Sequence, residues 1–199
     1  MKRISLSLVI FASIVFIGCK NDKKEEDNST ITDSEMNSTM DNEMEEESEI
    51  KKVTVTMNPN NDSNLAGEVV FTEEDGEVTM TALITGLQEG EHAIHLHEFG
   101  DCSMEDGSSA GGHWNPTDEP HGKWGDEEGY HKGDIGNFTT DSNGNGTITM
   151  TTDEWCIGCG DEEKDILGKS IIVHDGVDDF TSQPAGNAGD RLGCGVIEE

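Results

Sequence analysis

The sequence predicts an all-β fold: an eight-stranded antiparallel Greek-key β-barrel or sandwich, immunoglobulin-like, with two long functional loops. Its 24 glycines and 5% aromatic residues favour short strands and turns over long helices. Eight short segments alternate polar and apolar residues, and turn residues separate several of them. The chain has 199 residues, 32% hydrophobic and 28% charged, which fits one folded domain together with a segment that does not fold.

The first 18 residues predict a lipoprotein signal peptide. They begin with the basic residues Lys2 and Arg3, continue as an apolar run too short for a comfortable membrane span, and end in F-I-G before Cys19. The tetrapeptide F-I-G-C resembles a bacterial lipobox, in which the cysteine is acylated and becomes the new N-terminus. Acyl chains on Cys19 would anchor the domain to a membrane of a bacterial cell envelope, either the outer membrane facing the periplasm or the cell surface. The alternative is an ordinary signal peptide that Cys19 merely follows.

Residues 19–50 predict a disordered acidic tether between the lipid and the domain. Residues 20–50 hold 12 acidic and 3 basic residues and almost no apolar periodicity, so this segment cannot bury a core. A solvated spacer is the expected role, and a sorting or partner-binding patch is the alternative. The domain predicted at residues 51–199 carries 31 acidic against 7 basic residues. Nucleic acid is therefore not expected as a partner, because phosphate contacts need positive charge.

The predicted strands begin at the domain's first residue. In chain order they are K-K-V-T-V-T-M (51–57), L-A-G-E-V-V-F (65–71), E-V-T-M-T-A-L-I-T (77–85), H-A-I-H-L-H-E-F (92–99), I-G-N-F-T-T (135–140), G-T-I-T-M-T-T (146–152), K-S-I-I-V-H (169–174) and C-G-V-I (194–197). The turn signal E-D-G separates the second strand from the third, E-G precedes the fourth, and S-N-G-N-G separates the fifth from the sixth. An antiparallel barrel or sandwich follows from this rhythm.

Three segments need a separate interpretation. D-S-N-G-N-G-T (141–147) has oxygen-bearing side chains at alternating positions, as a calcium loop does, but Thr152 stands where a bidentate glutamate would be needed. A hairpin turn is predicted there instead. Residues 99–134 and 175–192 show no strand pattern at all. Irregular loops of this length are unusual in a compact domain unless they have a function or are held in place.

The histidines form a pattern that core packing does not explain. His95 and His97 are two residues apart on a strand, so their side chains leave the same face and can converge on one ion. His92 has the opposite parity and is expected to pack or to form hydrogen bonds. Further along the chain lie His113, His121, His131, Asp134 and His174. Three or four nitrogens around an open position suit copper or catalytic zinc, whereas histidines with one carboxylate in a closed tetrahedron suit structural zinc.

Five motifs give the chain a specific resemblance. They are H-L-H-E-F-G-D, S-A-G-G-H-W-N-P, H-G followed by H-K-G-D-I-G-N, I-I-V-H-D-G-V-D-D and G-N-A-G-D-R-L-G-C-G-V-I. Together they span nearly all of residues 52–198, and the chain resembles the copper/zinc superoxide dismutase family, in which they occur in this order. A single H-x-H would not carry this resemblance.

The resemblance implies a role for each candidate residue. The implied copper ligands are His95, His97, His113 and His174. The implied zinc ligands are His113, His121, His131 and Asp134. His113 would bridge the two metals as an imidazolate and take part in catalysis. Asp178 would join the outer nitrogens of a zinc-bound and a copper-bound histidine, and Arg191 would act as a catalytic residue at the mouth of the copper channel.

The implied activity is conversion of the superoxide anion to O2 and hydrogen peroxide by Cu2+/Cu+ cycling in the bacterial cell envelope. The alternative is an inactive relative that binds copper or zinc for storage or delivery. Zinc-dependent hydrolysis would need a general base and a substrate pocket, and neither has a candidate. A purely structural lipoprotein would leave the histidines unexplained. The sequence leaves open whether the chain is a monomer or a homodimer.

Two departures from the family pattern have consequences. The spacing from His121 to His131 is one residue longer than in the commonest members. The loop between His174 and Arg191 is short and has no lysine, so a positively charged rim is not expected. Because distant carboxylates are screened at physiological salt, we predict an activity that depends only weakly on ionic strength.

Four cysteines remain once Cys19 is set aside, and in an exported chain they can form two disulfides. Three pairings exist. We favour Cys156 with Cys159 and Cys102 with Cys194, although the spacing alone does not settle the choice. The resemblance implies the bond between Cys102 and Cys194, and the position of Cys102 directly after Gly-Asp resembles bacterial members. A thiol pair that binds Cu(I) is the alternative for Cys156 and Cys159.

Overall fold

The computed structural model describes residues 49–199. The predicted signal peptide at 1–18, the acylated Cys19 and almost all of the predicted tether at 19–50 lie outside the described residues. Within 49–199, no helix is long and apolar enough to cross a membrane.

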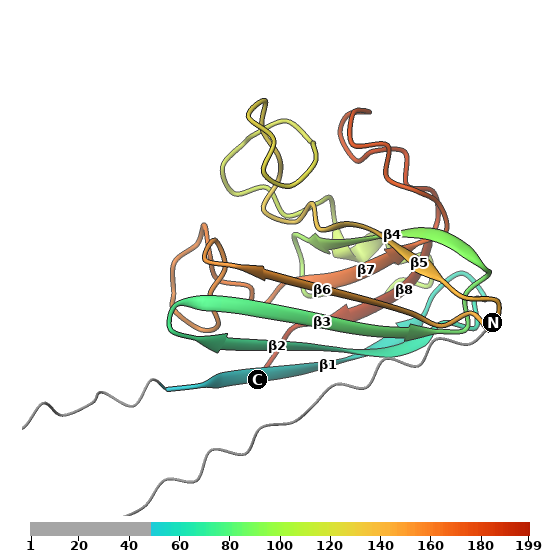
Figure 1. The fold of residues 1–199 in the computed structure, drawn as a ribbon, viewed down its shortest axis with the longest axis horizontal. Helices are drawn as coiled ribbons and strands as arrows, with labels where there is room; N and C mark the ends of the chain where they lie inside the picture. Colours follow the sequence, from blue (N-terminus) through green and yellow to red (C-terminus); the bar gives the residue numbers. More distant parts are fainter. Residues whose placement is uncertain (1–48) are drawn as a thin grey trace, which may run out of the picture. The chain divides into compact units, whose positions relative to one another are not determined.

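Eight antiparallel strands close into a barrel in the order β1-β2-β3-β6-β5-β4-β7-β8 (Figure 1). Their bounds are β1 Lys51–Pro59, β2 Ala66–Glu74, β3 Glu77–Thr85, β4 Gly90–His97, β5 Gly136–Thr140, β6 Gly146–Thr152, β7 Ser170–His174 and β8 Arg191–Val196. Residues 98–135 form the first long loop and residues 175–190 the second. A single 3-10 turn, Ser108–Ala110, interrupts the first long loop. The predicted all-β class, strand number and antiparallel Greek-key arrangement are confirmed, and closure leaves the sheet without open edges.

The first hairpins follow from local sequence rules. In β1 the side chains of Val53, Val55 and Met57 are buried at every second position, so one face of the strand belongs to the core. At the turn between β2 and β3, Asp75 and Gly76 have φ angles of 52° and 81°. Positive φ at both central residues is what a type I′ turn requires, and its twist matches that of the flanking strands.

The predicted hairpin turn between β5 and β6 is also present. Asp141 Oδ1 accepts hydrogen bonds from the backbone N–H groups of Asn143 and Asn145, each at 2.9 Å. The carboxylate is therefore engaged by its own turn, which supports a hairpin rather than a calcium loop at this position.

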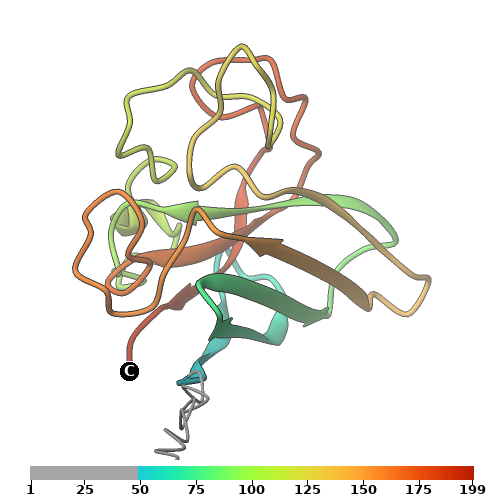
Figure 2. The ribbon, with the colours of Figure 1, turned by 60° about the vertical axis from the view of Figure 1, so that its left-hand side comes forward.

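The barrel order places distant segments side by side. β4 pairs with both β5 and β7, and every side chain of β7 is buried, as are the last six of β4. The loops that follow these two strands, residues 98–135 and 175–190, lie close together next to β4 and β7 (Figures 1 and 2). The strands are thus buried on the core side and covered on the other side by the loops.

The limits of six strands differ from the predicted limits, by three residues at most, and one further loop is present. β8 begins at Arg191, three residues before the predicted C-G-V-I segment, because Arg191 pairs with His174 across an irregularity in the β7 register. A third irregular segment, residues 153–169, connects β6 to β7, and the polar-apolar pattern did not single it out as a loop. This segment, called the 153–169 loop below, contains the bonded pair Cys156 and Cys159. Cys102 is bonded to Cys194, which ties the first long loop to β8.

Candidate metal centre

Strand parity divides the three histidines of β4 as expected. His95 and His97 are 0% and 1% exposed, and each contacts a covering loop, His95 at Asp178 and His97 at Gly111. His92 lies on the other parity, and its Nδ1 and Nε2 are each 3.0 Å from a backbone carbonyl oxygen, of His174 and Gln88. His92 is therefore a hydrogen-bonding residue of the barrel, in agreement with the prediction.

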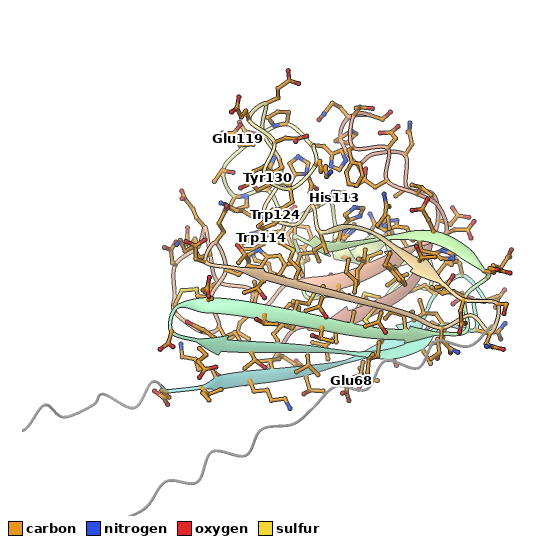
Figure 3. All side chains as sticks on the ribbon, in the orientation of Figure 1. Glu68, His113, Trp114, Glu119, Trp124 and Tyr130 are labelled. Carbon is orange, nitrogen blue, oxygen red and sulfur yellow. A yellow bond between two sulfur atoms is a disulfide. The ribbon has the colours of Figure 1, made fainter. Side chains whose placement is uncertain are left out.

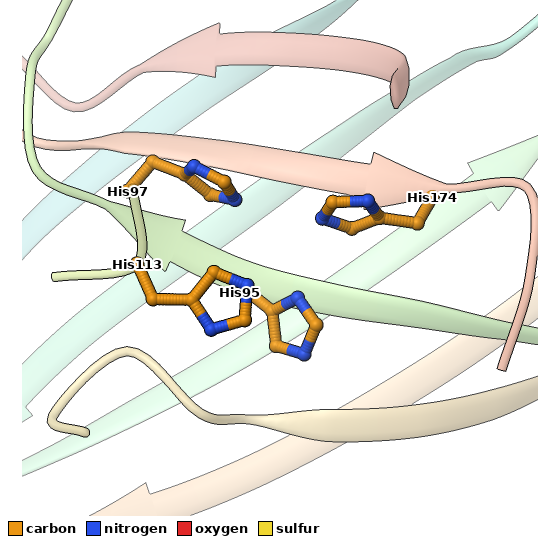
Figure 4. Close-up of side chains that lie close together, drawn as sticks. All are labelled: His95, His97, His113 and His174. Atoms are coloured by element: carbon orange, nitrogen blue, oxygen red, sulfur yellow. The ribbon is translucent and has the colours of Figure 1, made fainter. Parts of the chain in front are cut away.

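Four imidazoles meet where β4, β7 and the first long loop come together (Figure 4). They belong to His95, His97, His113 and His174, and one ring nitrogen from each lies within 4.8 Å of the others. The ring centroids of His95 and His113 are 4.0 Å apart, and those of His97 and His174 are 5.6 Å apart. His113 reaches the strands because its backbone bridges that of His97.

The outer nitrogens of the strand histidines are held by fixed acceptors. Nδ1 of His97 donates to the Gly111 carbonyl oxygen at 3.0 Å, and Nδ1 of His174 to the Gly189 carbonyl oxygen at 3.4 Å. Nε2 of His95 lies 2.9 Å from Asp178 Oδ2. With the proton placed on the outer nitrogen, each inner nitrogen keeps its lone pair free.

The inner nitrogens of this cluster have no hydrogen-bond partner although they are buried. They are His95 Nδ1, His97 Nε2, His113 Nε2 and His174 Nε2. Each unpaired buried polar atom costs about 1–3 kcal/mol, so four converging on one point make an unfavourable arrangement unless a cation fills it. Four imidazole nitrogens are a donor set that suits copper.

A second cluster shares His113 with the first and adds a carboxylate. Asp134 Oδ1 lies 2.8 Å from His113 Nδ1 and 3.2 Å from His131 Nδ1, and Asp134 Oδ2 lies 2.9 Å from His121 Nδ1. The Nδ1 atoms of His121 and His131 are near the Asp134 carboxylate, yet neither Nδ1 has hydrogen-bond geometry to it. Lone pairs that face carboxylate oxygens in this way need a cation between them, and three nitrogens with one oxygen suit zinc.

His113 presents one nitrogen to each cluster. Its Nδ1 faces Asp134 in the second cluster, and its Nε2 is among the unpartnered nitrogens of the first. A single ring can therefore contact a metal on either side, as the resemblance implies. His131 completes the second cluster despite the longer spacing from His121.

Asp178 contacts one histidine of each cluster at the ring nitrogen that faces away from the cluster. Its Oδ1 lies 2.9 Å from His121 Nε2 and its Oδ2 lies 2.9 Å from His95 Nε2, and the residue is 1% exposed. The backbone N–H of Phe180 also donates to Oδ1 at 2.7 Å. One carboxylate thus orients a ring in each cluster, and such partners fix tautomer and ring orientation.

The electrostatics favour neutral imidazoles in the first cluster. Burial, and then the charges of neighbouring histidines, lowers the pKa of His97 and His174 well below the usual value. Burial also lowers the pKa of His113 to about 4, against the opposing effect of Asp134. Burial acts in the same direction on His121, but the neighbouring carboxylates of Asp134 and Asp178 outweigh it and raise the pKa of His121 to about 9. Neutral rings can bind a metal without first losing a proton.

Arg191 lies beside the first cluster in a fixed position. Its Nη1 and Nη2 donate to the carbonyl oxygens of Gly107 and Gly111, each at 2.7 Å. The same Gly111 oxygen accepts from His97, so the loop positions the arginine and the histidine together. Arg191 lines a cavity of about 320 Å³ that also reaches His97, His113 and His174, and it contributes the one lysine or arginine side chain among the residues that line this cavity.

Sequence reasoning missed two residues of the second long loop. The Gln183 amide brackets the backbone of His121, since its Oε1 accepts from His121 N at 2.9 Å and its Nε2 donates to His121 O at 2.8 Å. Gly186 has φ +63°, and a Cβ there would lie 1.8 Å from Asp178 Oδ1. A loop glutamine and a loop glycine have no spacing rule of their own, so only the packed loops reveal these roles.

Comparison with known proteins identifies the same family that the sequence motifs resemble. A family model for copper/zinc superoxide dismutase matches residues 65–197. The chain is 40% identical over 139 residues to superoxide dismutase (Cu-Zn) 5 of Dictyostelium discoideum, which covers 66% of this chain and 88% of that protein. It is 41% and 39% identical over 145 and 146 residues to the superoxide dismutases (Cu-Zn) of Talaromyces marneffei and Botryotinia fuckeliana. Each of these alignments covers 68% of this chain and 91% of the relative.

Proposed function

The chain belongs to the copper/zinc superoxide dismutase family, and we propose that it converts superoxide to O2 and hydrogen peroxide. The observation that carries this proposal is the set of four unpartnered imidazole nitrogens beside a pinned arginine, at a cavity that a small anion can enter. A protein that only stored metal would not need Arg191 at that position.

The two donor sets fit the two metals of the family. His95, His97, His113 and His174 would hold copper, and His113, His121, His131 and Asp134 would hold zinc. When bound, copper supplies a one-electron redox couple that zinc lacks, and zinc supplies a redox-inert positive charge.

Arg191 binds the substrate in this proposal. Superoxide is a small anion, and a guanidinium in a half-buried position forms charge-assisted hydrogen bonds with it. Because Gly107 and Gly111 hold Nη1 and Nη2, the guanidinium needs little rearrangement when the anion arrives. The remaining N–H groups are available to the substrate.

His113 supplies a proton for the formation of hydrogen peroxide in this proposal. Its Nδ1 is held against Asp134, so Nε2 is the atom that can take up a proton and pass it to reduced dioxygen in the cavity. Asp178 orients His95 and His121 through their Nε2 atoms, and Gln183 holds the backbone of His121. These groups keep the rings in place while the proton moves.

The proposed location is the envelope of a bacterium, with the domain anchored through a lipid on Cys19. Support comes from the basic start, the apolar run and F-I-G-C at the N-terminus. Two disulfides in residues 49–199 fit an oxidising compartment. Incorporation of labelled fatty acid into the parent chain but not into Cys19→Ser would support the anchor, and equal labelling would contradict it.

The test of the activity compares the parent chain with His97→Ala. We expect His97→Ala to lose copper and superoxide removal, because it loses one of four copper donors. His92→Gln is the control, since it changes a buried imidazole of the same strand outside both clusters. Equal activity of the parent and His97→Ala would overturn the proposed copper site. A parent chain that binds copper without removing superoxide would instead indicate metal storage.

A further inference from the structure

Two consecutive residues of the 153–169 loop hold the chain on both sides of His131. The Glu154 carboxylate accepts from Tyr130 Oη at 2.6 Å through Oε1 and from Lys132 Nζ through Oε2. The indole Nε1 of Trp155 donates to the Lys132 carbonyl oxygen at 2.9 Å. Both neighbours of one metal-site histidine are therefore tied to the same two residues.

Trp155 is anchored in the barrel core. It is 1% exposed, and its ring packs edge-on against Phe71 with the centroids 6.2 Å apart and against Trp124 with the centroids 5.5 Å apart. Trp124 in turn packs against Tyr130 at 5.0 Å, and these two rings lie near one another in the first long loop (Figure 3). The indole N–H is thus aimed at the His131 segment by packing rather than by a flexible side chain.

The loop that carries Glu154 and Trp155 is itself fixed to the barrel. Cys156 is bonded to Cys159, and its backbone N–H donates to the Lys164 carbonyl oxygen at 2.9 Å. The backbone N–H of Ile157 donates to Glu73 Oε2 at 2.8 Å. Since β2 contributes Glu73, the loop is connected to a strand remote from the metal clusters.

Movement of the His131 backbone would affect more than one zinc donor. The backbone N–H of His131 donates to Asp134 Oδ2 at 2.8 Å, and that carboxylate faces all three histidines of the second cluster. On the other side of the turn, the backbone N–H of Gly133 donates to the Trp114 carbonyl oxygen, and the Gly133 carbonyl oxygen accepts from the backbone N–H of Leu96, each at 3.0 Å. The turn at 131–134 is thus held by barrel backbone on one side and by Glu154 and Trp155 on the other.

We propose that Glu154 and Trp155 are positioning residues for the zinc site, which set the His131–Asp134 turn in the geometry that binds the metal. The proposal rests on the assignment of zinc to the second cluster. Glu154 acts as a carboxylate: partial burial opposes its charge, but hydrogen bonds from Lys132 and Tyr130 lower its pKa. Residues that contact a metal ligand typically contribute 10- to 100-fold in metal affinity. Glu154 and Trp155 contact the sequence neighbours of His131 and not His131 itself.

The test uses the full chain with Co2+ as a spectroscopic probe of the zinc site. Glu154→Gln keeps the shape of the side chain and removes its charge, and Trp155→Phe keeps a packed ring and removes the indole N–H. Asp153→Asn is the matched control, because it removes one charge from an exposed neighbour in the same loop. Co2+ affinity and visible absorption are measured, together with amide hydrogen exchange at residues 130–134 in the metal-free chain.

We expect Glu154→Gln and Trp155→Phe each to weaken Co2+ binding by on the order of tenfold, to shift its visible absorption and to speed exchange at 130–134. Exchange in β1–β3 and the properties of Asp153→Asn should match the parent. Parent-like affinity, spectrum and exchange in both variants would overturn the proposal, as would an equal loss in Asp153→Asn. If the parent bound no Co2+, the proposed function would fail, and exchange at 130–134 would still decide the role of Glu154 and Trp155.

Discussion

Removal of the Cys102–Cys194 disulfide should destabilise the domain far more than removal of Cys156–Cys159. The first bond joins residues 92 apart in sequence, and the second joins residues 3 apart. Loop-closure entropy in the unfolded chain then corresponds to about 4.6 kcal/mol for the first bond and about 1.6 kcal/mol for the second. Cys102 and Cys194 also pack with Ala110 and Ile172, so serine would lose apolar contacts there as well. The expected difference in unfolding free energy is at least about 3 kcal/mol.

The assay is guanidinium unfolding of the metal-free full chain, with Cys102→Ser/Cys194→Ser compared against Cys156→Ser/Cys159→Ser. Metal must be absent, because metal binding to the folded state would mask the effect of the crosslink. The slope of unfolding free energy against denaturant should be reported for each variant, since the loss of a long crosslink also expands the unfolded chain. Equal losses of stability, or a larger loss for the short bond, would refute the entropic reasoning.

Three further predictions concern the active site. Arg191→Lys keeps the charge but replaces two separate donor nitrogens by one, so a lysine held by the same carbonyl oxygens has fewer N–H groups left for the anion. The value of kcat/KM should therefore fall by on the order of tenfold at unchanged copper content, and an unchanged kcat/KM would contradict this role. Gly186→Ala should displace Asp178 from His95 and His121 and weaken zinc binding by on the order of tenfold, measured by competition with a chelator; parent-like affinity would show that the loop yields at no cost. Activity should change little with added salt, because the screening length is about 8 Å at physiological ionic strength and Arg191 is the one lysine or arginine lining the cavity; a steep fall in rate with salt would refute this expectation.

The strand pattern and the parity of the histidines could be predicted because both depend on neighbours in sequence. The two-residue period of a strand places His95 and His97 on one face and His92 on the other, whatever the rest of the barrel does. The turn at Asp141 could likewise be distinguished from a calcium loop by the absence of a glutamate at position 152. The 153–169 loop was harder to assign, since its polar residues and its short C-I-G-C segment carry no period.

The features that could not be predicted depend on contacts between segments that are distant in sequence. The start of β8 at Arg191 follows from pairing with His174, and pairing across a register irregularity leaves no local signal. The roles of Gln183 and Gly186 arise where one long loop packs on the other. Glu154 and Trp155 are 22 or more residues away from the loop residues that they contact.

The sequence by itself determined the strand order along the chain, the type of donor at each metal position and, through the resemblance, the family. These are properties of residue identity and short-range spacing, which the printed chain contains in full. The tertiary structure decided which nitrogen of each imidazole is free, how Asp178 connects the clusters and what holds His131 in place. Those features require a closed barrel and two packed loops, because hydrogen-bond partners and burial exist only once remote segments meet.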